Sequence, residues 1–382
     1  MQIAPAELGG RLHSADVRLV VGTRPEAIKL APVAHALAAR GTTPRLVLTG
    51  QHPALVPAEF GLGRLPADPL ECPGEEDPQR HVRAVTAALL PRLADPPDLV
   101  VVQGDTSSAL GAALAAFTAG VPLAQVEAGL RTHDPQLPWP EEEYRTAIEA
   151  GADLLFAPTA VAAANLYAEQ VAGEIHVTGN TAIDALLAAE VGLPPPTPRD
   201  GDRPRILVTA HRRESWGAGL QSIGEAVTEL GRDADVRFVL HPNPHVAAKM
   251  RALLGGAAGV SLIEPCGHRE LLMLMREADL VLSDSGGIQE EAPALGVPLL
   301  VLREKTERPE GIACGSARLV GTSAERIFGE ARRLLGDGVA LAAMQRRSFP
   351  YGDGDAAPRI AAIIEQWLER RETLAATAGK QG

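Results

Sequence analysis

The residues best suited to acid–base chemistry are carboxylates that follow predicted strands. Glu127 lies at the end of an apolar strand, and Glu141 opens a helix after a proline-rich loop. Arg131 follows the first of these carboxylates, and Arg145 follows the second. Two carboxylates near separate arginines can be held at different pKa values and can give and take protons. Glu141 could instead serve only to favour the positive end of its helix.

A third carboxylate, Asp105, lies in a turn that follows the predicted strand of the stretch 97–117. A small-residue helix comes directly after this turn. An aspartate at such a point either caps the helix or belongs to a site at the end of the strand. The residue pattern leaves both interpretations open.

The turn Ser285-Gly286-Gly287 suggests a second kind of chemistry, the binding of an anion. It separates an apolar strand from a helical pattern that begins at Ile288. Two glycines leave backbone N–H groups without side-chain cover, and the polarity of a helix N-terminus favours negative charge. The turn therefore predicts a phosphate site, with an ordinary glycine-containing turn as the alternative.

Basic and polar groups follow several other predicted strands, and Lys29 comes about one helical turn after the first of them. These groups are Arg24, Gln51, His52, His211, Arg212 and His241. Open α/β sheets bind ligands beyond the carboxyl ends of their strands, so these groups are expected around one anion. Arg24 could instead be a solvated loop arginine, and His52 alone is more simply interpreted as a plain loop histidine.

Strands alternate with helical patterns along nearly the whole chain, which predicts parallel sheets covered by helices. A linker rich in proline and charge at 192–205 separates two series of these units. We therefore expect an α/β protein of two doubly wound, Rossmann-like domains that face a central cleft. Residues 1–15 are expected to be loose, the tail after 371 disordered, and the charged loop that begins at 303 outside the core.

Composition excludes several classes of protein. The chain has 382 residues, 46% of them hydrophobic, and a formal net charge of −12, which argues against a general surface for nucleic acids or anionic membranes. The three cysteines have no metal-binding spacing, so neither a zinc site nor a disulfide framework is expected. No signal peptide or membrane-spanning run is predicted, and we expect a cytoplasmic protein that needs no metal or other cofactor.

A set of motifs runs in one order over almost the whole chain. They are GTRPEAIKLAP (22–32), TGQH (49–52), QGDT (103–106), VEAGLRT (126–132), PWPEE (138–142), VTGNTAIDALL (177–187), TAHRRES (209–215), HPNP (241–244), SDSGGIQEEAPALGVPLLVLREKTERPE (283–310) and PYGDG (350–354). In these motifs the chain closely resembles the bacterial non-hydrolysing UDP-N-acetylglucosamine 2-epimerases. The resemblance implies a GT-B fold and reversible conversion of UDP-N-acetylglucosamine to UDP-N-acetylmannosamine without a cofactor.

The resemblance also implies a division of the chain and a mechanism. Residues 1–178 with 360–382 would form the first domain, because the last helix crosses back, and 179–359 would form the second. UDP would be eliminated as C2 loses a proton, and would add again to a 2-acetamidoglucal intermediate. Homodimers are common in the family, so a homodimer is expected.

The resemblance implies roles for individual residues. Arg24, His211, Ser285, Gly286 and Gly287 would hold the diphosphate, Glu290 the ribose, and Arg308 the sugar. Asp105, Glu127 and Glu141 match the acidic catalytic positions of the family, and His211 is grouped with them.

Departures from the family pattern keep other activities open. Tyr144 stands where the family usually has asparagine, so it could alter the sugar pocket and favour a hydrolysing relative that releases UDP and N-acetylmannosamine. A GT-B glycosyltransferase and a nucleotide-sugar sensor are further alternatives. Gln51 and His52 match a second, activating substrate site of many bacterial members, but 74–90 does not clearly supply its Arg-Gln pair.

Overall fold

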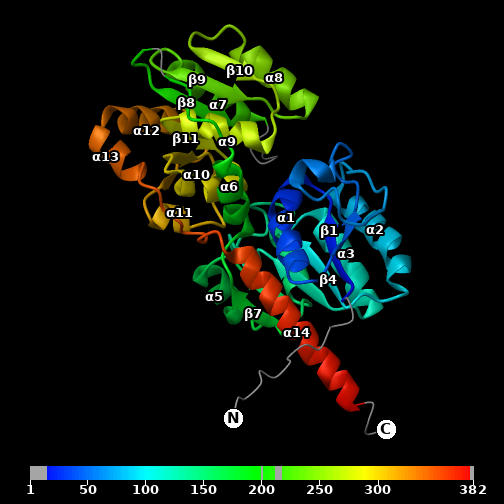
Figure 1. Cartoon of the computed structure of the whole chain (residues 1–382). Coiled ribbons are helices and arrows are strands. Elements are labelled where there is room, and N and C mark those ends of the chain that lie inside the picture. Colours follow the sequence, from blue (N-terminus) through cyan, green and yellow to red (C-terminus); the bar gives the residue numbers. More distant parts are fainter. Residues whose placement is uncertain (1–14, 199–200, 211–216, 379–382) are drawn as a thin grey trace, which may run out of the picture.

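The structure is a computed structural model that describes residues 15–198, 201–210 and 217–378 (Figure 1). Residues 1–15 were expected to be loose, and all of them except Ala15 lie outside the described residues. Within the described residues, the strands form two separate sheets, one of seven strands and one of six. The term "first domain" is used below for the part built on the first sheet, and "second domain" for the part built on the other.

The first sheet is entirely parallel and has the strand order β3-β2-β1-β4-β5-β6-β7. Its strands are β1 (Val17–Val21), β2 (Arg45–Leu48), β3 (Ala67–Pro69), β4 (Leu99–Gln103), β5 (Leu123–Val126), β6 (Leu154–Ala157) and β7 (Glu174–Val177). The intervening helices are α1 (Arg24–Ala39), η1 (Pro57–Phe60), α2 (Pro78–Leu89), η2 (Leu90–Leu93), α3 (Ser107–Ala119), α4 (Glu141–Glu149) and α5 (Ala160–Ala168). The order reverses between β1 and β4, which is the switch point of a doubly wound fold.

The second sheet repeats this plan with the order β10-β9-β8-β11-β12-β13. Its strands are β8 (Arg205–Thr209), β9 (Asp235–Val239), β10 (Val260–Ile263), β11 (Leu280–Ser283), β12 (Leu299–Val301) and β13 (Ala317–Leu319). The helices from here to the end of the described chain are α6 (Thr181–Val191), α7 (Ala218–Leu230), α8 (Pro244–Leu254), α9 (His268–Glu277), α10 (Gly286–Leu295), α11 (Glu310–Ala313), α12 (Ala324–Gly336), α13 (Gly338–Met344) and α14 (Ala356–Ala378). The prediction of two doubly wound α/β domains is confirmed.

Alternation along each strand places the cores on both faces of each sheet. In β1, Val20 packs with α2 and α3, whereas Leu19 and Val21 pack with α1 and α14. The second sheet divides in the same way, because Val208 packs with α7 and Leu207 packs with α6 and α10. Strands covered on both faces need apolar residues at every position, which is why their sequences are continuous apolar runs.

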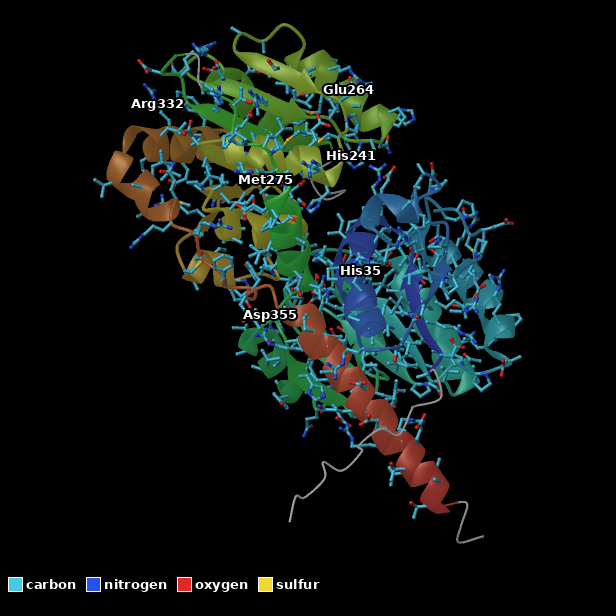
Figure 2. All side chains as sticks on the ribbon, in the orientation of Figure 1. His35, His241, Glu264, Met275, Arg332 and Asp355 are labelled. Atoms are coloured by element: carbon cyan, nitrogen blue, oxygen red, sulfur yellow. The ribbon has the colours of Figure 1, made fainter. Side chains whose placement is uncertain are left out.

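The chain passes between the domains twice. Helix α6 follows β7 but contributes Ile183 and Leu186 to the core of the second sheet. Helix α14 returns from the second domain and packs Ile360 and Trp367 against the core of the first sheet; Figure 2 shows Asp355 at this return. These contacts support the predicted division into 1–178 with 360–382 and 179–359, which we keep as a proposal.

The structure corrects one expectation for the end of the chain. The residues after 371 were predicted to be disordered, but α14 continues as a regular helix to Ala378, and its last turns extend beyond the body of the first domain (Figure 1). The free cysteines Cys72, Cys266 and Cys314 agree with the absence of a disulfide framework. Over the described ranges, no helix is both long and apolar enough to cross a membrane.

Candidate active site

Neighbouring strand ends bring the predicted carboxylates to one edge of the first sheet. Strands β4 and β5 pair in parallel with Gln103 opposite Val126; Glu127 follows Val126 directly, and Asp105 follows Gln103 after one glycine. Glu127 has a φ of 68°, a left-handed conformation that is uncommon for a residue with a side chain and often marks a functional site. Topology alone therefore places the two carboxylates at the ends of adjacent strands.

Glu127 is buried and receives hydrogen bonds from both domains. Arg308, in the loop after β12, donates from Nη2 to Oε1 of Glu127 over 2.8 Å. The other oxygen accepts from Lys29 of α1, from Gln103 Nε2 at 3.0 Å and from Asn180 Nδ2 at 3.3 Å. Two cations and two amides therefore surround this carboxylate and fix its position.

Glu290 connects the same two cations on the side of the second domain. Its carboxylate lies 3.0 Å from Lys29 Nζ and accepts a 2.6 Å hydrogen bond from Arg308 Nε. Burial alone would lower the pKa values of Lys29 and Arg308, but the surrounding carboxylates outweigh burial and raise both. Lys29, Glu127, Glu290, Glu307 and Arg308 are called the interdomain charge cluster below.

Three charged side chains of the loop that was expected outside the core are buried, whereas Glu304 and Lys305 of the same loop are exposed. Arg303 and Glu307 are each 2% exposed and Arg308 is 6% exposed. Arg303 Nη1 lies 2.9 Å from Glu307, which also pairs with Arg308. Burying a charge is costly unless it is paired, and these side chains pair with one another and across the domains.

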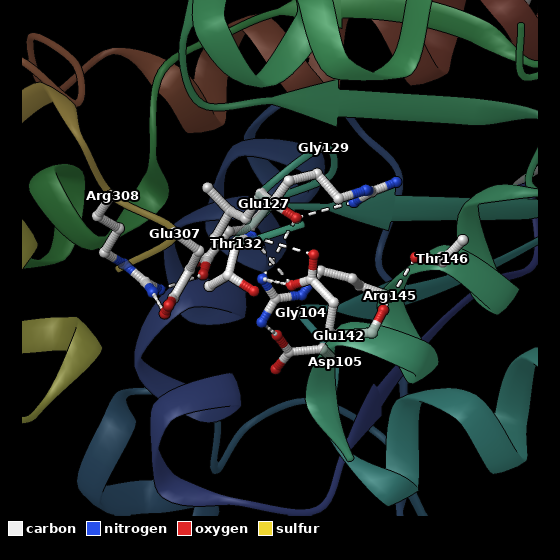
Figure 3. Close-up of polar contacts among 12 residues, drawn as sticks. Gly104, Asp105, Glu127, Gly129, Thr132, Glu142, Arg145, Thr146, Glu307 and Arg308 are labelled. Carbon is white, nitrogen blue, oxygen red and sulfur yellow. Dashed lines mark hydrogen bonds and ion pairs between the residues drawn. The ribbon is translucent and has the colours of Figure 1, made fainter. Parts of the chain in front are cut away.

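Asp105 forms a second, smaller group with Arg145. The guanidinium of Arg145 donates to Asp105 and also lies 3.1 Å from Glu142. Burial would lower the pKa of Arg145, but Asp105 and Glu307 raise it. Figure 3 shows this group on one side of the site and Glu307 with Arg308 on the other. The side chain of Asp105 is 26% exposed, so it is the more accessible of the two strand-end carboxylates.

The structure does not bring Arg131 to these carboxylates. Its guanidinium pairs with Glu149 of α4 and with Glu169, and it lines a surface pocket with His133. Arg145, from α4, instead supplies the cation beside the strand-end carboxylates. Glu141 is the first residue of α4 and is partly buried beside this group.

The two predicted anion-binding turns face one another across the domains. Arg24 is exposed in the first turn of α1, and Ser285 is the N-cap of α10 without a side-chain capping bond. In α1, Lys29 lies little more than one turn after Arg24. It contacts Glu290, which lies one turn after Gly286 in α10. Both helix N-termini therefore direct their positive ends toward the same region.

Gln51 and His52 belong to a hydrogen-bonded group at neighbouring strand ends. Gln51 Oε1 accepts a 2.7 Å hydrogen bond from Ser108, whose hydroxyl also lies 2.7 Å from that of Thr49. His52 Nδ1 accepts from the backbone N–H of Arg24 over 3.4 Å. These hydrogen bonds connect the residues that follow β1, β2 and β4.

Three predicted groups in the second domain have different outcomes. His211 and Arg212 lie outside the described residues, so their predicted roles stay predictions. His241 lies at the end of β9 on the side that faces the first domain (Figure 2), and its Nδ1 accepts from Asn243 N over 2.9 Å. Among the described residues, no group of three or more His, Cys, Asp or Glu side chains could hold a metal ion.

Tyr144 occupies the hydrophobic core of the first domain. It is 3% exposed and belongs to the cluster that includes Val85 and Ile148. Within the described chain its buried hydroxyl has no hydrogen-bond partner. Burial raises the pKa of this phenol to about 12, helped by Asp77 and Glu141. The phenol that replaces the usual amide is therefore packed into the core and does not project as a pocket wall.

Sequence reasoning missed three residues that complete the site. Gln103 and Asn180 donate to Glu127, and Glu307 neutralises Arg303 and Arg308. Gln103 and Asn180 stand inside the conspicuous stretches QGDT and VTGN, which was the available signal. An amide carries no charge, however, and its partner becomes apparent only when distant strand ends meet.

Two doubly wound domains, with carboxylates and cations where they meet and two helix N-termini directed at the same region, define a GT-B protein of the nucleotide-sugar class. The comparisons with known proteins narrow this class. The family model described as UDP-N-acetylglucosamine 2-epimerase matches residues 35–365. The chain belongs to this family.

Individual relatives match this chain over nearly their whole length. The UDP-N-acetylglucosamine 2-epimerase of Escherichia coli K12 is 42% identical over 365 residues, which cover 90% of this chain and 96% of the relative. The crystal structure of the Neisseria meningitidis enzyme bound to UDP-GlcNAc has a TM-score of 0.87 and 37% identity, covering 92% and 100% of the two chains. The Methanocaldococcus jannaschii enzyme in complex with UDP-GlcNAc and UDP has a TM-score of 0.81 and 31% identity, covering 92% and 99%.

Proposed function

We propose that this protein interconverts UDP-N-acetylglucosamine and UDP-N-acetylmannosamine by inverting C2 without releasing the free sugar. The observation that carries the proposal is the pair of carboxylates at adjacent strand ends. Asp105 is paired with Arg145 and Glu127 with Arg308. Inversion at carbon needs proton transfer at C2, and charged carboxylates are suitable bases for this step.

The reaction begins with elimination. A carboxylate takes the C2 proton, the electron pair of that C–H bond forms a C1–C2 double bond, and the C1–O bond breaks toward UDP. The products of this step are UDP and 2-acetamidoglucal. The reverse addition then returns the UDP oxygen to C1 and delivers a proton to the opposite face of C2. Atoms and electrons balance without an oxidant, a metal or a cofactor.

The different surroundings of the carboxylates support different roles for them. Glu127 is buried and accepts from four donors, two of them cationic, so both of its oxygens are already occupied. Asp105 has one cationic partner and a partly exposed side chain. We therefore assign the removal of the C2 proton to Asp105. Glu127 acts with Arg308 on the sugar, and Glu141 stays a candidate for the second proton transfer.

Retention of UDP is what distinguishes epimerisation from hydrolysis. Ser285, Gly286 and Gly287 lie at the N-terminus of α10, where backbone N–H groups favour a diphosphate. Arg24 is exposed in the first turn of α1 and would add its guanidinium. Glu290 would bind the ribose, and Gln51, His52 and His241 line the neighbouring turns. The position of Tyr144 in the core removes the feature that favoured the hydrolysing alternative.

Proton NMR of UDP-N-acetylglucosamine incubated with the protein in D₂O tests the proposal. Loss of the H2 signal together with a new nucleotide-linked manno signal is the expected result. Free N-acetylmannosamine with stoichiometric UDP would establish the hydrolysing reaction instead. An unchanged spectrum in the presence of demonstrated binding would overturn both reactions for this substrate and favour a transferase or a sensor.

The predicted homodimer and cytoplasmic location stay part of this proposal. Light scattering coupled to size exclusion measures the molar mass directly, and twice the chain mass of 40.0 kDa is the expected value.

A further inference from the structure

Two motifs near the domain crossings contribute no group to the substrate contacts or proton transfers described above. VTGN ends at Asn180, in the first crossing, and PYGDG contains Tyr351, at the start of the second crossing. Both residues are buried, at 3% and 1% exposure. We propose that Asn180 and Tyr351 are positioning residues that connect the interdomain hinge to Glu127 and Arg308; the catalytic consequence rests on the proposed function.

The two crossings are held against each other through their backbones. The N–H of Asn180 donates to the carbonyl oxygen of Tyr351 over 2.7 Å. A Cβ atom added to Gly352 would lie 3.0 Å from the Cα of Gly179 and 3.1 Å from the N of Asn180. Only a residue without a side chain permits this approach, and Gly352 also has a φ of 134°. The crossings therefore form one joint.

Asn180 extends from this joint to the first domain. Its Oδ1 accepts from Ala182 N over 2.9 Å and caps α6, whereas its Nδ2 donates to Glu127 over 3.3 Å. A rotation of α6 would therefore move a hydrogen-bond donor of Glu127. The side chain serves both as a helix cap and as a contact with a proposed active-site carboxylate.

Tyr351 extends from the same joint to the second domain. Its hydroxyl donates to the carbonyl oxygen of Arg308 over 3.0 Å and accepts from the N–H of Gly311 over 2.9 Å. Burial raises the pKa of this phenol, so it stays a hydrogen-bond donor at neutral pH. Arg308 then contacts Glu127. Contacts thus run in a closed ring from Glu127 through Asn180, Tyr351 and Arg308 back to Glu127.

The ring predicts that domain orientation and active-site geometry change together. Asn180→Ser keeps a good helix cap but removes the donor to Glu127. Tyr351→Phe keeps the aromatic side chain but removes its hydroxyl. In both variants kcat is expected to fall about tenfold, as for a lost hydrogen bond next to a charge. KM for UDP-N-acetylglucosamine should stay nearly constant, because neither side chain belongs to the proposed substrate contacts.

Hydrogen–deuterium exchange of the unliganded protein provides a test without turnover. Both variants should exchange faster than wild type in 303–316. Asn180 is connected to this segment only indirectly, through its contacts with Glu127 and Tyr351, so faster exchange in Asn180→Ser tests the closed ring of contacts. The matched control is Tyr167→Phe on the exposed side of α5, which should change neither kcat nor exchange. A single cooperative thermal unfolding transition in each variant would show that the variants fold.

Unchanged exchange in 303–316 of Asn180→Ser would overturn the proposal, and so would a wild-type kcat in both variants. Failure of the proposed function is recognised separately, because wild-type protein would then leave UDP-N-acetylglucosamine unchanged. In that case the exchange of 303–316 still decides whether the joint and Arg308 are connected.

Discussion

Arg308 of the second domain donates a 2.8 Å hydrogen bond to Glu127 of the first domain, and neither side chain is more than 7% exposed. The two residues are separated by 181 positions in the sequence. A buried ion pair between two domains gives each charge a counterion only when the domains meet correctly. The proposed active site is therefore also a principal polar contact between the domains.

Glu127→Gln should reduce both activity and stability. The amide would leave Lys29 and Arg308 with one carboxylate fewer in a buried site, and breaking such a pair costs about 3–5 kcal/mol. The epimerisation rate should fall by roughly 10², because Arg308 would lose the carboxylate that holds it beside the sugar and small misplacements near reacting groups have large effects. Rates of H2 exchange by NMR and calorimetric unfolding measure the two effects. The exposed Glu225→Gln on α7 is the control, and equal rates in both variants would contradict the role of Glu127.

Gly286→Ala should displace Arg308. A Cβ atom at this position would lie 2.9 Å from both Cζ and Nη1 of the guanidinium, and overpacking of this kind costs about 1–3 kcal/mol. A displaced Arg308 should slow epimerisation by up to roughly 10², because small misplacements near reacting groups have large effects.

The control for this substitution is Gly329→Ala in α12, where an added Cβ would have no neighbour within 4 Å. Since alanine favours a helix interior, this control should stabilise the protein by about 0.5–1 kcal/mol and leave the rate unchanged. Initial rates and melting temperatures of the two variants provide the comparison. A Gly286→Ala variant with the wild-type rate would show that Arg308 tolerates the shift.

Tyr144→Phe should leave the product unchanged and should not destabilise the protein. Its hydroxyl is buried without a hydrogen-bond partner among the described residues, so removing it relieves a desolvation cost of about 1–3 kcal/mol. Tyr351→Phe, which removes a hydroxyl with two partners, should lower the melting temperature instead. Release of free sugar by Tyr144→Phe but not by wild type would show that Tyr144 does affect the sugar pocket.

Stability should fall in mildly acidic solution through His81. This histidine is 1% exposed; Ser107 Oγ donates to its Nδ1 and its Nε2 donates to Cys72 O. Burial lowers its pKa below the ordinary 6.5, against smaller opposing effects of the hydrogen bond to Cys72 O and of the charge of Glu75. The unfolded chain therefore binds a proton before the folded chain does. The contribution of neutral His81 is complete above pH 6.5 and decreases as the pH falls toward the lower folded value.

Melting temperatures between pH 7.5 and 5 test this dependence. His81→Gln should have a shallower decrease than wild type, since one proton contributes at most about 1.4 kcal/mol per pH unit. Substitution of the exposed His245 by glutamine should leave the decrease unchanged. A His81→Gln profile parallel to that of wild type would assign the acid sensitivity to other groups.

The sequence by itself determined the architecture and the kinds of groups in the site. Continuous apolar runs such as Val17–Val21 can be covered only on both faces, so they required parallel sheets between helices. Turns with glycine or carboxylates after these runs had to gather at the carboxyl edges of the sheets. This is why Asp105, Glu127 and Ser285–Gly287 could be selected as candidates without coordinates.

Only the tertiary structure decided which of these groups meet. Arg131 and Arg145 were equivalent in the sequence, yet one pairs with Glu149 and the other with Asp105. Arg303 and Arg308 seemed too charged for burial, but their counterions came from residues folded around them. Local patterns are set by the backbone period of each element, whereas ion pairing depends on helix rotation and on the approach of two domains, which no single segment encodes.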